Sequence, residues 1–180
     1  FLFASQIGMA LGQIAQSALG STDVGIPLAD GSTTALVARN IEDFADELEI
    51  PFEEVLQFIA LRECAHHRLF TGVPWLAGDL TRAVERYAQH IAIDSEAVAE
   101  AATRLDPANP EFNEDSLNEQ IFAAAPTPEQ RAALERVENL LALIEGWVDV
   151  VTSQAARPYL PHLEQLRELM RRRRALGGPV

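Results

Sequence analysis

Residues 51–70 read PFEEVLQFIALRECAHHRLF, and this stretch decides the fold that the sequence predicts. Pro51 suits the first turn of a helix, and the two glutamates behind it favour the positive end of the helix dipole. Apolar residues lie most of the way round the predicted helix, which is typical of a buried helix. It nevertheless contains Arg62, Glu63 and His66. Because an unpaired buried charge costs several kcal/mol, we expect these side chains to meet partners from another element.

A second apolar helix offers such partners. Thr127 and Pro128 combine an N-cap residue with a proline at the first helical position, and they predict a helix over residues 128–156. At 100° per residue, its carboxylates Glu145 and Asp149 share a narrow arc within a mostly apolar surface. One helix offers arginine and histidine and the other offers carboxylates, so we expect them to pack together. Periodicity leaves two interpretations open, a buried ion-pair network and a metal or catalytic site.

The rest of the chain predicts a mainly α fold in a single domain, residues 1–180. A small β element near residues 34–39 is the most sheet that the pattern supports, and Asn40 is expected to cap the helix that follows it. Because the chain starts without Met and ends shortly after a helical pattern, we expect a fragment of a longer, cytoplasmic protein. Further helices are predicted at 1–19, 41–49, 75–91, 95–105 and 161–175.

Composition excludes several classes of function. The 27 acidic and 14 basic residues give a net charge of −13, which repels phosphate backbones and argues against nucleic acid as a partner. No apolar run reaches the roughly 20 residues of a membrane helix. A single cysteine rules out a disulfide framework and a cysteine-rich zinc site. All basic residues are arginine, so lysine-based catalysis is absent. The oligomeric state is not predicted.

Several single residues have expected structural roles. Trp75 and Trp147 are predicted to anchor the core, and Cys64 is expected to be a small buried residue. Gly146 is expected to let another backbone approach closely. The run Arg171–Arg174 is predicted to be a solvated helix end that pairs with the protein's own acidic surface.

The motifs resemble those of a known family. Residues 62–66, RECAH, with HRLF at 67–70 and VPWL at 73–76, are similar to the HExxH-bearing helix of a bacterial family of zincin-like metallopeptidases. Residues 145–149, EGWVD, resemble its second motif, and further likenesses extend over nearly the whole chain. Members of the family are described as hydrolases, and some are associated with biosynthesis of a deazaflavin cofactor. The resemblance implies a zincin-like, mostly helical domain.

The resemblance also implies roles for particular residues. In an HExxH helix two histidines one turn apart bind zinc, the adjacent glutamate activates a zinc-bound water, and a later carboxylate completes the site. A further carboxylate commonly orients a ligand histidine. By this likeness His66 and Glu145 are the expected metal ligands, Glu63 is the catalytic general base, and Asp149 is the orienting group. The expected substrate is a peptide or protein.

This sequence departs from the motif at its first histidine, where it has Arg62. A guanidinium group has no lone pair for a metal, and catalytic zinc sites normally keep three protein ligands. We therefore expect zinc to bind weakly or not at all, and Arg62 to lie against Glu145 or Asp149. Three functions remain open: a hydrolase with an impaired site, a non-catalytic module that binds a peptide, ligand or partner, and a purely structural helical module.

Overall fold

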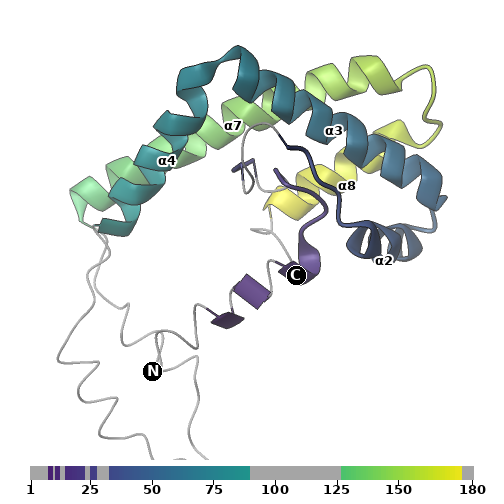
Figure 1. Cartoon of the computed structure of the whole chain (residues 1–180), viewed down its shortest axis with the longest axis horizontal. Helices are drawn as coiled ribbons and strands as arrows, with labels where there is room; N and C mark the ends of the chain where they lie inside the picture. The colour runs from purple at the N-terminus through teal and green to yellow at the C-terminus, as the bar shows by residue number, and fades with distance from the viewer. Residues whose placement is uncertain are drawn as a thin grey trace, which may run out of the picture. The chain divides into compact units, whose positions relative to one another are not determined.

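The described part of the chain is almost entirely helical (Figure 1), as predicted. The computed structural model describes residues 8–9, 11–12, 15–22, 25–27, 33–89 and 127–175. The predicted helix at 95–105 lies outside these residues, and so does most of the one at 1–19. Contacts divide the chain into a first unit, residues 1–78 and 140–180, and a second unit, residues 79–139. The main helices are α2 (Ala38–Leu48), α3 (Phe52–Gly72), α4 (Pro74–Gln89), α7 (Pro128–Ala156) and α8 (Leu163–Ala175).

The β element near residues 34–39 is a single antiparallel bridge between Gly20 and Leu36. Helix α2 already begins at Ala38, with Val37 in the capping position, so the prediction that Asn40 caps this helix is wrong. The Asn40 amide instead donates hydrogen bonds to the carbonyl oxygens of residues 15 and 18, at 3.0 and 2.8 Å. It therefore satisfies backbone acceptors where the preceding helical stretch ends, and this ties the N-terminal segment to α2.

The core of the first unit forms where α2 and α8 pack against α3. Val55, Phe58 and Ile59 lie at helical spacing on one face of α3 and are buried against this core. Glu54, on the same face, accepts hydrogen bonds from the backbone N–H of His162 at 2.6 Å and from its Nδ1 at 2.9 Å. The start of α3 is thereby fixed to the start of α8. Other core side chains come from the remaining elements, among them Leu19, Ile41, Leu160, Leu166 and Met170.

Several residues expected in the core or at a close approach lie at the surface instead. Trp75 is 58% exposed, Trp147 is 39% exposed, and Cys64 is exposed as well. Apart from its chain neighbours and the backbone of its own helix, no described atom lies within 4 Å of the position that a Cβ on Gly146 would take. These predictions are wrong. For Cys64 and Trp147 the reason is that the polar residues of α3 and α7 bond to one another on the inner faces, so these two side chains on other faces are turned outward. Trp75 lies in the first turn of α4, outside this contact. Within the described residues, no helix combines the length and apolar character needed to span a bilayer.

Candidate functional site

Charged side chains from three helices of the first unit converge around Glu145. Arg62 and His66 come from α3, Glu145 from α7 and Arg174 from α8. Arg62, His66 and Glu145 are 3%, 1% and 5% exposed, so this cluster lies within the protein interior. Helices α3 and α7 thus meet at their polar residues, as the sequence predicts.

The Glu145 carboxylate has a partner on each oxygen. Its Oε2 accepts hydrogen bonds from Arg62 Nη2 at 2.6 Å and from Arg174 Nη1 at 2.7 Å. Its Oε1 lies 2.7 Å from His66 Nε2, and His66 Nδ1 lies 3.0 Å from the carbonyl oxygen of Arg62. The expected contact between Arg62 and Glu145 is therefore present.

These partners keep Glu145 ionised in spite of its burial. Burial by itself raises the pKa of the Glu145 carboxyl, whereas the hydrogen bond with His66 and the charges of Arg62, His66 and Arg174 lower it. The outcome is a pKa of about 2, below the ordinary value of 4.5. Glu145 is thus a buried anion held by cations, as a buried charge requires.

Asp149 lies one turn beyond Glu145 and is bound to Arg167 of α8. The Arg167 guanidinium donates from Nη2 at 2.7 Å and from Nε at 3.1 Å, one bond to each carboxylate oxygen. This paired hydrogen bond, with the positive charges nearby, lowers the pKa of Asp149 against the effect of burial. The His66 ring is bonded to Glu145 and to the Arg62 carbonyl, as described above. The orienting role implied for Asp149 therefore stays a prediction, and the observed role is to hold α8 to α7.

Glu63 faces the segment 19–22 rather than Glu145. Ser21 Oγ and Thr22 Oγ1 each donate to its carboxylate at 2.8 Å, and the Thr22 N–H donates at 3.3 Å. Gly20 makes the close approach possible, because a Cβ there would lie 2.6 Å from the Glu63 carboxyl carbon. Beside Glu63 is a cavity of about 30 Å³ that is also lined by His67 and Phe70. That volume suits about one water molecule.

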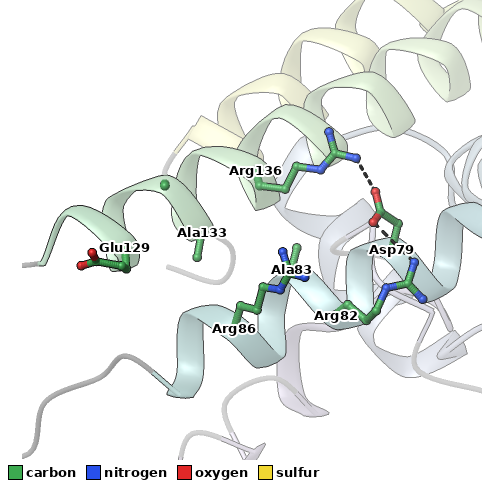
Figure 2. Close-up of a pocket in the computed structure, with 8 residues that line it drawn as sticks. Asp79, Arg82, Ala83, Arg86, Glu129, Ala133 and Arg136 are labelled. Atoms are coloured by element: carbon green, nitrogen blue, oxygen red, sulfur yellow. Dashed lines mark hydrogen bonds and ion pairs between the residues drawn. The ribbon is translucent and has the colours of Figure 1, made fainter.

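The second unit contains a larger cavity, of about 490 Å³, between α4 and α7 residues (Figure 2). Asp79 lies at its wall and pairs with Arg136 and with Arg82. The hydrogen bond from Arg136 is the main cause that lowers the pKa of Asp79. None of the residues predicted for the site lines this cavity. The lining residues are Asp79, Arg82, Ala83, Arg86, Glu129, Ala132, Ala133 and Arg136.

The side chains around Glu145 do not fit a zinc ion. His66 and Glu145 are bonded directly to each other, and two guanidinium groups, which cannot ligate a metal, share the other carboxylate oxygen. Across the described ranges, no three His, Cys, Asp or Glu side chains are grouped so that they could hold a metal ion.

Sequence reasoning missed four residues of this region, namely Ser21, Thr22, Arg167 and Arg174. Only the two arginines left a signal. They are seven positions apart, and this spacing places them on one face of α8.

Comparison with known proteins gives a family. A family model described as zincin-like metallopeptidase matches residues 1–180, the whole of the chain. No curated protein matches this chain, and no solved structure matches it. The chain therefore belongs to the zincin-like metallopeptidase family.

Proposed function

We propose that this protein keeps the hydrolase scaffold of its family with a degenerate zinc site, and that its zinc-dependent hydrolysis is lost or strongly impaired. The observation that carries the proposal is the 2.6 Å ion pair between Arg62 and Glu145. Arg62 has the sequence position of the first histidine ligand, and its charge is held by the carboxylate expected to be the third ligand.

Charge pairing opposes zinc uptake. An ion that bound to Glu145 would displace Arg62, whose side chain is only 4% exposed. A buried guanidinium without its carboxylate costs several kcal/mol, and this cost would be subtracted from the binding free energy of the ion. A site that lacks one histidine ligand also forms fewer bonds to the metal, so less binding free energy is available to offset the cost of displacing Arg62.

The position of Glu63 supports the same proposal. A general base must lie within hydrogen-bond reach of the proton that it removes. Both oxygens of Glu63 accept hydrogen bonds from Ser21 or Thr22, and the side chain is buried. Its carboxylate is thus used to hold the N-terminal segment.

Metal analysis and a cleavage assay on the same preparation test the proposal. We expect the purified protein to contain no stoichiometric zinc and to cleave no member of a mixed peptide library. Glu63→Gln serves as the matched control, because it removes the general base but leaves the Arg62–Glu145 pair intact. One zinc ion per chain, with cleavage that Glu63→Gln abolishes, would refute the proposal.

A non-catalytic binding module is the second candidate function. Leu143, Trp147 and Val150 are exposed on one face of α7, at 61%, 39% and 54%. A row of large exposed apolar side chains favours contact with a peptide or protein. Selection of binders from a displayed peptide library tests this candidate. Trp147→Ala should weaken binding of the selected peptides, whereas Glu63→Gln should leave their binding unchanged. Peptides that bind both variants like the unchanged protein would count against it.

A further inference from the structure

We infer that Arg174 is a second cation of the candidate site, so that Arg62 and Arg174 together replace the charge of a divalent ion. This inference rests on the proposed function and extends it. The sequence predicts only Arg62 at this site and places Arg174 in a solvated run of arginines. The structure brings the two guanidinium groups to the same oxygen of Glu145 from different helices.

The geometry around Glu145 supports two cations. Arg62 and Arg174 approach Oε2 at 2.6 and 2.7 Å, while His66 Nε2 is 2.7 Å from Oε1. Two guanidinium groups that share one oxygen repel each other, and an ionised carboxylate between them offsets this repulsion. Removal of either arginine still leaves the other one on Oε2, where it continues to oppose an incoming metal ion.

The charges that contact Glu145 lead to the same conclusion. Arg167 is paired with Asp149, so the two guanidinium groups bonded to Glu145 are those of Arg62 and Arg174. Loss of Arg62 alone leaves the Arg174 charge on Oε2, whereas loss of both leaves the Glu145 carboxylate without a guanidinium partner. We therefore expect Glu145 to become available to zinc only when both arginines are removed.

Arg174 can be changed without removing the other contacts of α8. Its side chain is 30% exposed, whereas Leu166 and Met170 of the same helix are in the core. The neighbouring Arg173 donates to the Ser17 carbonyl oxygen at 2.5 Å and lies over the Phe44 ring, 5.7 Å from its centre. Arg167 adds its bonds to Asp149. These contacts would remain in an Arg174 variant.

Zinc titration of matched variants tests the inference. The proteins are the unchanged chain, Arg62→His, the double variant Arg62→His with Arg174→Gln, and a control with Arg62→His and Arg172→Gln. Arg172 is a matched control because it lies on the same helix but is 70% exposed and pairs with Glu168. The readouts are zinc affinity, measured by competition with a chromophoric chelator, and the shift in melting temperature on adding zinc.

We expect the double variant to bind one zinc ion per chain at least about tenfold more tightly than Arg62→His. We expect the Arg172 control to match Arg62→His. A further variant, Arg62→His with Arg174→Lys, keeps the positive charge and should give no gain over Arg62→His. A double variant that folds only when zinc is present supports the inference. One that folds neither with nor without zinc overturns it.

The outcomes separate this inference from the proposed function. If Arg62→His alone binds zinc as tightly as the double variant, Arg174 has no part in excluding the metal. The inference then fails, while the proposed function stands. If the unchanged protein binds one zinc ion per chain, the proposed function itself fails.

Discussion

His66 Nε2 lies 2.7 Å from Glu145 Oε1, so the two expected metal ligands are bonded directly to each other. A tetrahedral zinc ion with bonds of about 2.0–2.2 Å would hold these two atoms roughly 3.3 Å or more apart. The observed distance is that of a hydrogen bond. With Arg62 and Arg174 on the second oxygen, Glu145 is the centre of an ion-pair cluster that unites three helices. The stability of the first unit should therefore depend on this carboxylate.

Glu145→Gln should destabilise the protein strongly. The amide removes the negative charge but keeps the shape of the side chain, so Arg62 stays buried with no anion beside it. Removing one partner of a buried pair costs about 3–5 kcal/mol, and we expect a loss near the lower end because the amide oxygen still accepts a hydrogen bond. Urea denaturation measures the change in the free energy of unfolding.

Glu168→Gln is the matched control for this prediction. Glu168 also pairs with two arginines, Arg171 and Arg172, but all three side chains are exposed to solvent. Exposed ion pairs contribute little, so no measurable loss is expected. Equal effects of the two substitutions would show that burial of the Glu145 cluster adds nothing to stability.

Acid should remove the stabilisation that the ionised Glu145 carboxylate contributes. The pKa of Glu145 is about 2 in the folded protein, whereas its ordinary value, which applies to the unfolded chain, is 4.5. The folded state therefore protonates this carboxylate less readily than the unfolded state does. The stabilisation is complete above pH 4.5 and is lost as the pH falls toward 2. Its size is about 3 kcal/mol, because one pKa unit corresponds to about 1.36 kcal/mol.

Urea denaturation followed by circular dichroism over this pH range checks the sign and the size of the change in the free energy of unfolding. Glu145→Gln has no group to titrate at this position, so its stability should fall less steeply between pH 4.5 and 2. Some fall remains in the variant because the pKa of Asp149 is lowered too. Identical slopes for the unchanged protein and the variant would contradict the assignment of this titration to Glu145.

The meeting of α3 and α7 could be predicted because charged residues within apolar helices must find partners. Arg62, His66 and Glu145 carry that signal in the sequence itself. The same reasoning failed for Trp75, Trp147 and Cys64. An apolar side chain is buried only where another element covers its face of the helix, and local periodicity does not show which faces are covered.

The partners of Glu63 could not be predicted either. Ser21 is 42 positions away from it, in a segment whose glycine, serine and threonine composition indicates only a loop. Hydroxyl groups of a loop are normally solvated, so their type gives no sign that they hold a buried carboxylate. Arg174 shares a face of α8 with Arg167, but it is one of four consecutive arginines that point in different directions around the helix. The sequence does not show which of the four reaches Glu145.

Each of the two hydroxyl groups that hold Glu63 should contribute measurably to the free energy of unfolding. Ser21→Ala removes a 2.8 Å hydrogen bond to a buried carboxylate, and Thr22→Val removes another. Hydrogen bonds to charged groups contribute about 1.5–3 kcal/mol each, so either change should lower the free energy of unfolding by this amount. Thr71→Ala is the control, since the Thr71 hydroxyl is exposed and bonds to carbonyl oxygens of its own helix. If Ser21→Ala has no larger effect than this control, Glu63 is not held as described.

Two glycine substitutions should have opposite signs. In Gly20→Ala the new Cβ would lie 2.6 Å from Glu63 Cδ and Oε1, and the carboxylate cannot move away without losing its bonds to Ser21 and Thr22. Overpacking of this kind costs about 1–3 kcal/mol. Gly146 lies inside α7, and its added Cβ would meet no described atom within 4 Å other than its chain neighbours and the backbone of its own helix. Gly146→Ala should therefore raise the free energy of unfolding by about 0.5–1 kcal/mol through helix propensity. Urea denaturation of both variants measures the two changes in the free energy of unfolding. If Gly20→Ala is neutral, the Glu63 carboxylate is free to move and is available as a base after all.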